Sequence, residues 1–322
     1  MRSAHSPDNL SMKMKSSRPI FHWKKLGLAI AAQEDIGWMS HYAGPSFAIS
    51  EKNAVRIFVT GRDSHNQSRI GMVEGELQPN GLTVTGITKS PVFDLGDLGC
   101  FDESGVSYPW LVKSGDTLYM YYVGWTAGGR TRFQNFTGLA ISTDDGMTFQ
   151  RASRVPLLDR TEQEPYGSGS CAVWIEDDSW HMIYTAFEPW RATPSGPKAS
   201  YCLKEALSDD GLNWRRTGRV VIDFMSPHET IIGKPMLLRD PQNYKLWYSH
   251  RGDSYRIGYA ESVDGINFVR MDDETGIDVS SNGWDSQMIE YAFVIDHLGS
   301  RYMLYNGNDF GRTGLGLAIL SQ

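Results

Sequence analysis

The segment Tyr119-Met120-Tyr121-Tyr122 decides the fold, because the sequence contains four more apolar stretches of the same type. The other four stretches are 56–59, 181–184, 245–248 and 302–305. The ends of successive stretches are 57 to 64 residues apart. Self-similarity at a nearly fixed period is the signature of a repeat architecture. We therefore expect five copies of one structural unit.

Each copy also contains signals for three neighbouring strands. An apolar arm precedes the repeated stretch, as at 109–112, and another apolar stretch follows it, as at 137–142. Three of the following stretches run into an Asp-Gly turn, which contains Gly146, Gly211 or Gly265. We interpret these turns as structural rather than metal-binding, because Asp caps such turns and Gly accepts a positive φ. With a fourth stretch such as 156–159, the pattern predicts an all-β fold, a five-bladed β-propeller with four-stranded blades.

The two ends of the repeat indicate how the ring closes. The chain ends at the third strand of the fifth unit, 313–320, and an apolar segment, 25–31, precedes the first unit. We predict that this N-terminal strand completes the last blade, which removes an exposed sheet edge. Residues 1–20 are polar and predict a disordered leader, and 21–322 predict a single propeller domain.

Composition narrows the functional classes. Aromatic residues make up 12% of the chain and charged residues 21%, which favours a β-rich globular protein. The net charge of −7 argues against a nucleic-acid partner, and no apolar stretch approaches the ~20 residues of a membrane span. Cys100, Cys171 and Cys202 form no CxxC pair, which predicts reduced thiols in a cytoplasmic protein. Without zinc-spaced Cys/His clusters, the sequence predicts neither a metal site nor a cofactor.

Acidic residues recur in the segments that lead into the first strand of each unit. First strands line the channel of a propeller, so these segments are expected to meet at one mouth. Glu103, Glu229 and Asp285 share one register there, and Lys234 and Glu290 share another. Glycosidic cleavage requires paired carboxylates, and we therefore predict the four acids as catalytic candidates. In the alternative interpretation, these acids bridge neighbouring blades.

The predicted binding residues surround these acids. They are Trp38, His41, Arg62, Asp102, His228, Lys234 and Arg251. Aromatic rings suit stacking on sugar faces, and the Arg and His side chains suit an anionic sugar or a phosphate. The predicted partner is a carbohydrate or another sugar-containing small molecule, with an anionic group favoured by these cations. The sequence does not define an oligomeric state.

Several of these motifs resemble a known group of proteins. Trp38-Met39-Ser40-His41, Phe101-Asp102-Glu103-Ser104-Gly105, and Trp284-Asp285 with Glu290-Tyr291 are similar to segments of bacterial glycosyl-hydrolase-like five-bladed propellers. That group is related to the arabinanase, invertase and levansucrase families. The resemblance covers about 21–322 and implies a place in carbohydrate metabolism, often in polysaccharide biosynthesis.

The catalytic pattern of the related hydrolases does not carry over. The resemblance implies an Asp nucleophile in the first blade, a stabilising Asp in the second and a Glu acid in the third. Here the first blade offers His41 and the third has only Glu164 upstream of Gly and Ser residues. Three functions therefore stay open: a glycoside-hydrolase-like enzyme, which we favour, a non-catalytic glycan-binding or scaffold propeller, and a glycosyl phosphorylase or transferase.

Overall fold

The computed structural model describes residues 21–321, and the leader predicted at 1–20 lies outside the described residues. The described part contains twenty strands and three short 3-10 helices, so the all-β prediction is confirmed. Within 21–321, no helix has both the length and the apolar character needed to cross a membrane.

The strands pair in five antiparallel groups of four. The first group contains β2 (Tyr42–Glu51), β3 (Ala54–Arg62), β4 (Ser68–Gln78) and β5 (Gly81–Ile87). The second group contains β6 (Gly105–Ser114), β7 (Thr117–Ala127), β8 (Phe133–Ser142) and β9 (Gln150–Arg151). The third group contains β10 (Ser168–Glu176), β11 (Ser179–Arg191), β12 (Lys198–Ser208) and β13 (Arg215–Ile222).

The fourth group contains β14 (Ile231–Arg239), β15 (Tyr244–Arg251), β16 (Tyr255–Ser262) and β17 (Val269–Arg270). The fifth group contains β18 (Glu290–His297), β19 (Ser300–Asn306), β20 (Leu315–Leu320) and β1 (Trp23–Ile30). Single parallel pairs, Ser68 with Gly105 and Tyr201 with Ile231, join the first group to the second and the third to the fourth. The two eight-stranded sheets are therefore each two antiparallel groups linked at one point.

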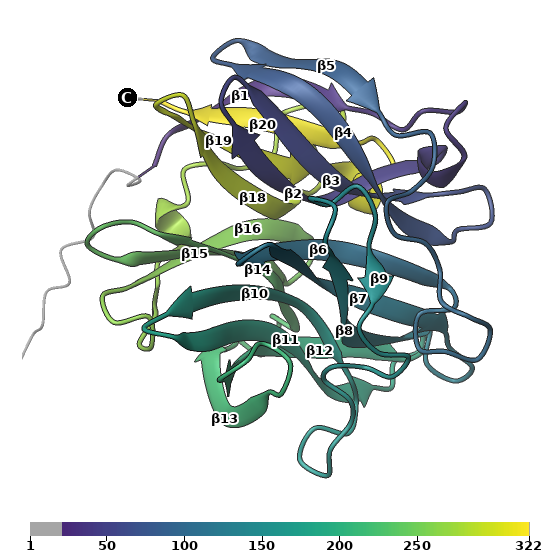
Figure 1. The fold of residues 1–322 in the computed structure, drawn as a ribbon. Coiled ribbons are helices and arrows are strands. Elements are labelled where there is room, and N and C mark those ends of the chain that lie inside the picture. Colours follow the sequence, from purple (N-terminus) through teal and green to yellow (C-terminus); the bar gives the residue numbers. More distant parts are fainter. Residues whose placement is uncertain (1–20, 322) are drawn as a thin grey trace, which may run out of the picture.

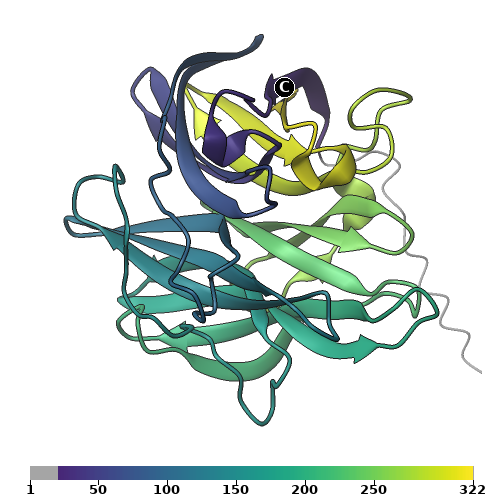
Figure 2. The same cartoon turned by 90° about the vertical axis from the view of Figure 1, so that its right-hand side faces the viewer.

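The N-terminal strand occupies the predicted place. β1 pairs antiparallel with β20, from Trp23 opposite Leu320 to Ile30 opposite Leu315. In both views the purple N-terminal strand lies beside the yellow C-terminal strands (Figure 1, Figure 2). The pairing covers the edge of β20 that would otherwise present unpaired backbone groups.

The Asp-Gly turns have the predicted structural role. Asp210 Oδ1 accepts hydrogen bonds from the backbone N–H groups of Leu212 and Asn213 at 2.8 and 2.7 Å. Gly211 has a φ of +71°, and a Cβ there would lie 2.8 Å from the ring of Trp180. Both conformation and space therefore require glycine. Among residues 21–321, no group of three or more His, Cys, Asp or Glu side chains is arranged to hold a metal ion.

The first strand of every group contains a shift of register that positions the site. In β6, β14 and β18 the irregular stretch begins at Tyr108, Lys234 and Tyr291, whose φ angles are +54°, +51° and +58°. Gly44 and Gly169 occupy the start of the shift in β2 and β10. A bulge redirects a side chain that regular pleating would send to the other face. Positive φ at non-glycine residues is uncommon and concentrates at functional sites.

Candidate ligand-binding site

A pocket of about 870 Å³ opens among all five strand groups. Its walls come from the ends of second strands, at Arg62, Arg191 and Arg251, and from the connections that follow second strands, at Arg132 and Phe310. Its floor includes residues of the first strands, such as Ser107, Ser170 and Lys234. The volume is in the range of small-molecule binding sites.

The charge of the pocket is opposite to that of the chain. Six Lys and Arg residues line it, namely Arg62, Arg132, Arg191, Lys198, Lys234 and Arg251, together with His228. Among the described residues that line the pocket, Asp253 is the single acidic one. The chain has a net charge of −7, so cations are concentrated here while acids prevail elsewhere. A cleft with one sign of charge attracts ligands of the opposite sign.

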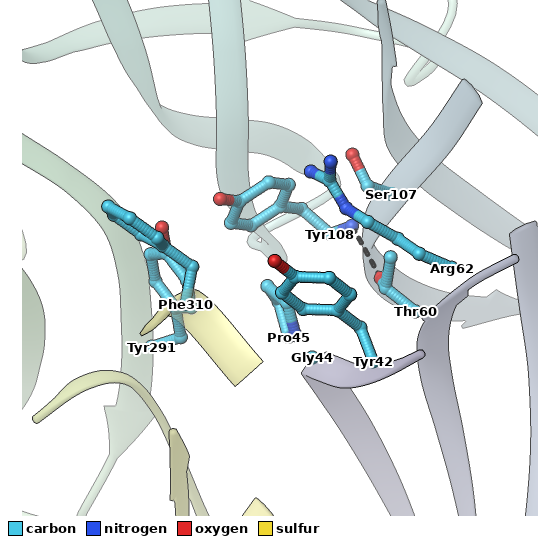
Figure 3. A pocket seen from close by; sticks show the side chains of 9 residues that line it. All are labelled: Tyr42, Gly44, Pro45, Thr60, Arg62, Ser107, Tyr108, Tyr291 and Phe310. Atoms are coloured by element: carbon cyan, nitrogen blue, oxygen red, sulfur yellow. Dashed lines mark hydrogen bonds between the residues drawn. The ribbon is translucent and has the colours of Figure 1, made fainter. Parts of the chain in front are cut away.

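A smaller pocket of about 90 Å³ adjoins the large one and shares several lining residues with it. Figure 3 shows Tyr42, Arg62 and Tyr108 facing the same space as Tyr291 and Phe310. The guanidinium of Arg62 lies 5.5 Å from the ring centre of Tyr42, and the Tyr108 and Tyr291 rings meet edge-on at 5.2 Å. Aromatic rings and a guanidinium together form a surface on which a sugar ring can stack.

Glu290 is buried behind the lining tyrosines. It is 0% exposed, and within 21–321 neither carboxylate oxygen has a hydrogen-bond partner. Burial raises the pKa of Glu290 well above its ordinary value, although the Tyr291 hydroxyl and the Arg251 guanidinium act to lower it. Tyr201 and Tyr255, whose hydroxyls are 3.0 Å apart, lie in the same cluster. The raised pKa favours the protonated carboxyl group of Glu290, which is the form that a general acid requires.

Lys234 is the second buried ionisable group at the pocket. It is 3% exposed, and its Nζ has no hydrogen-bond partner among the described residues. Burial lowers the pKa of Lys234 to about 8. Its Nζ lies 6.0 Å from the ring of Trp110 and 5.9 Å from that of Phe293.

None of the four predicted catalytic acids is among the described residues that line the pocket, although Glu229 lies between the lining residues His228 and Thr230. Glu229 is bound by Arg270 at 2.7 Å and by His250 Nδ1 at 2.8 Å, and Asp285 is bound by Lys25 at 2.7 Å. These contacts hold the pKa of Glu229 down to about 2. Asp102, predicted as a binding residue, is likewise held by Arg151 at 2.7 Å and the Tyr122 hydroxyl at 2.9 Å.

These buried acids follow one structural rule. Each precedes the first strand of its group and pairs with a base on the fourth strand of that same group. The pairs are Asp102 with Arg151, Glu164 with Arg216, Glu229 with Arg270, and Asp285 with Lys25. The acids therefore link the inner and outer strands within a group. For Glu229 and Asp285, a link within one group differs from both interpretations made from the sequence, in which these acids met at the channel mouth or bridged neighbouring blades.

Three further candidates are also placed elsewhere. Glu103 accepts a hydrogen bond from the backbone N–H of Gly99 at 2.6 Å, within its own loop. Trp38 is 3% exposed and donates to the backbone carbonyl of Thr88 at 2.8 Å, so its ring is part of the core. His41 is exposed and lies 2.9 Å from Ser40 Oγ, outside the lining of both pockets.

The structure does bring together four predicted binding residues, Arg62, His228, Lys234 and Arg251, with the predicted acid Glu290 behind them. Five further residues that form the site were not predicted from the sequence, namely Tyr201, Tyr255, Arg132, Arg191 and Lys198. A signal for the last three was available. They lie on the hairpins between the second and third strands, the end of each unit where Arg62 and Arg251 had been noted.

The fold is that of glycoside hydrolases. A solved structure described as "Glycoside hydrolase" is 19% identical with a TM-score of 0.73, over 95% of this chain and 92% of the other. A solved complex of BT0996 with RGII is 18% identical with a TM-score of 0.71, over 94% and 91%. The Bombyx mori GH32 beta-fructofuranosidase BmSUC1 is 14% identical with a TM-score of 0.59, over 92% of this chain and 61% of that one. The resemblance to glycosyl-hydrolase-like proteins related to invertases is thereby confirmed for the fold.

The sequence also has closer relatives. No family model matches the chain. Two proteins of Mycobacterium tuberculosis, "Uncharacterized protein MT1551" of strain CDC 1551 / Oshkosh and "Uncharacterized protein Rv1502" of strain ATCC 25618 / H37Rv, are each 37% identical over 302 residues. The alignments cover 93% of this chain and 99% of each relative. This protein belongs to the same family as these two mycobacterial proteins.

Proposed function

We propose that this chain is a carbohydrate-active enzyme that binds an anionic ligand in the pocket and transfers a glycosyl group to or from phosphate. The observation that carries the proposal is the composition of the site, six Lys and Arg residues around a pocket with one buried acid, Glu290, behind its wall. The glycoside-hydrolase-like fold, and the RGII in the complex of the structural neighbour BT0996, support a carbohydrate ligand.

The number of carboxylates favours phosphate over water as the partner in the reaction. Hydrolysis requires a second carboxylate as nucleophile or base, and Glu229 and Asp285 are already engaged in ion pairs with Arg270 and Lys25. Phosphate already carries negative charge and needs no base, but it needs cations to hold it. A phosphate oxygen would bond to the anomeric carbon as the glycosidic C–O bond breaks.

In this reaction Glu290 is the proposed source of the proton for the leaving oxygen. Because its carboxyl group lies behind Tyr291, a tyrosine hydroxyl would relay the proton into the pocket.

We infer the corresponding architecture to be a five-bladed propeller, in which the five antiparallel groups are the blades and the pocket lies on their common axis. A cytoplasmic location and a role in polysaccharide biosynthesis remain proposals that rest on the reduced cysteines and the resemblance.

The experiment is an assay of inorganic phosphate release from a panel of sugar 1-phosphates with sugar acceptors, and of glycoside cleavage with and without phosphate. We expect turnover that depends on phosphate, and a loss of roughly 10²-fold or more in Glu290→Gln. Glu229→Gln is the matched control, because Glu229 is buried like Glu290 but is held in an ion pair with Arg270. Cleavage that proceeds without phosphate and survives Glu290→Gln would contradict the proposal.

A second candidate function is sugar binding without chemistry. The observation in its favour is that both carboxylate oxygens of Glu290 are buried within the described structure and are not exposed to the pocket. This candidate predicts that anionic sugars bind to the pocket while no product forms with any donor in the panel.

A further inference from the structure

The side chain of Lys234 is unusual among the cations of the pocket. Arg132, Arg191 and Lys198 are exposed and form the rim, whereas Lys234 is 3% exposed at the floor. It extends from the bulge in β14, where its φ of +51° departs from regular strand geometry. The bulge turns this residue toward the pocket.

The surroundings of Lys234 provide no counter-charge. Trp110 on β6 and Phe293 on β18 present uncharged rings to its Nζ. The titratable group that acts on it within the described residues is the Cys171 thiol on β10, and burial raises the pKa of that thiol, which keeps it neutral. An ammonium that is buried without a partner is costly, and such groups in native structures call for a functional explanation.

We propose that Lys234 is the anchor for the acidic group of the ligand, a carboxylate or a phosphate monoester, at the floor of the pocket. This inference rests on the proposed function and deepens it by assigning the place of the anion. The hydroxyls of Ser170 and Thr185, 3.2 Å apart, also line the floor and supply polar contacts beside the cation. Ser170 Oγ accepts the backbone N–H of Lys234 at 3.0 Å, which ties the two residues together.

The anchor works by a small movement. The Nζ atom is covered, so contact with a ligand requires rotation about the terminal bonds of the lysine, which its four-carbon stem permits. An anion that binds there replaces the missing counter-charge and favours the protonated amine. Binding is therefore coupled to the protonation of Lys234, whereas the rim cations provide attraction without such coupling.

The test is a titration of the protein with sulfate and, separately, with inorganic phosphate. Isothermal calorimetry measures the affinity of each anion at several pH values from 7 to 9.5. Sulfate keeps its charge over this range, so a change in its affinity reports on the protein. Because the pKa of Lys234 is about 8, most molecules lose the proton on this amine between pH 7 and pH 9.5. We therefore expect the affinity for sulfate to fall roughly tenfold or more. Lys234→Met should remove this dependence together with most of the affinity. Lys234→Arg should retain binding with a flat pH profile, because arginine stays charged.

The control is the double variant Arg191→Ala with Lys198→Ala, which removes two rim cations and should weaken binding while leaving the pH profile of the wild type. Glucuronate and glucose 6-phosphate, each compared with glucose, then distinguish a carboxylate from a phosphate as the preferred acidic group. The inference is overturned if anions bind Lys234→Met as tightly as the wild type, or if Lys234→Arg keeps the wild-type pH profile. If no anion binds the wild type at all, the proposed anionic ligand is wrong as well.

Discussion

Glu290 and Glu229 are both buried glutamates near the start of a first strand, yet their pKa values are shifted in opposite directions. Burial without a partner raises the pKa of Glu290, whereas Arg270 and His250 hold the pKa of Glu229 at about 2 despite its burial. The difference follows from the partners, since desolvation opposes ionisation in both cases. One carboxyl group is thus available as an acid and the other stabilises the fold.

The first prediction concerns the pH dependence of stability. Because burial raises the pKa of Glu290 in the folded chain above its value in the unfolded chain, stability falls as pH rises above about 4.5 toward the folded pKa. Glu290→Gln removes this loss. In urea unfolding, its free energy of unfolding relative to the wild type should therefore rise from pH 5 to 7, by at most about 1.4 kcal/mol per pH unit.

Glu229→Gln provides the contrast with the opposite sign. The ionised Glu229 stabilises the fold above the unfolded pKa, and this contribution is lost as pH falls from about 4.5 toward 2. The variant should be less stable than the wild type at pH 7 by roughly 3 kcal/mol, because it leaves Arg270 without its main partner. If both variants shift stability in the same direction at pH 7, the assignment of their charge states is wrong.

At the scale of the element, β1 shows how one strand completes both a sheet and an ion pair. Its backbone covers the edge of β20, and its Lys25 holds the buried Asp285 at 2.7 Å. The neighbouring Lys24 is exposed and forms no ion pair within residues 21–321. The two lysines, neighbours on one strand, therefore allow the ion pair to be tested against an exposed control.

The second prediction uses this pair. Lys25→Met should lower the free energy of unfolding by about 2 kcal/mol, because Asp285 stays buried without its cation. Lys24→Met should change it by less than about 0.5 kcal/mol, as expected for an exposed substitution. Urea unfolding of both variants measures the difference, and equal effects would show that the ion pair does not tie β1 to the fold.

The same elements show what could be predicted from sequence. β1 and the Asp-Gly turns were predicted because apolar runs and turn chemistry act over a few residues. The bulges were not, since a register shift depends on how strands pair. As a result, Lys234 was aligned with Glu290, whereas the structure gives it the same place in the bulge as Tyr291.

The site was predicted in part for a similar reason. Arg62 and Arg251 were found because they occupy one place in the repeat, at the end of the second strand. Glu229 and Asp285 share a place in the repeat as well, but their partners, Arg270 and Lys25, lie on the outer strands. A repeated acid alone does not reveal whether its partner is a base or a substrate.

For the whole molecule, the main feature is the separation of charge. The chain carries a net charge of −7, while the pocket that all five groups surround is lined by cations. This arrangement opposes non-specific binding of anions over the surface and favours their entry at one place. It is the feature that most clearly distinguishes this site from a two-carboxylate hydrolase site.

Calorimetric titration of anionic sugars, with a neutral sugar as reference, tests most directly whether the pocket takes an anionic sugar ligand. The panel consists of glucuronate, glucose 1-phosphate, glucose 6-phosphate and a nucleotide sugar, with glucose as reference, at low and high salt. We expect that at least one anionic member binds more tightly than glucose, that salt weakens this binding, and that the double variant Arg62→Ala with Arg251→Ala abolishes it. If glucose binds as tightly as every anionic member and salt has no effect, the pocket does not select an anionic ligand.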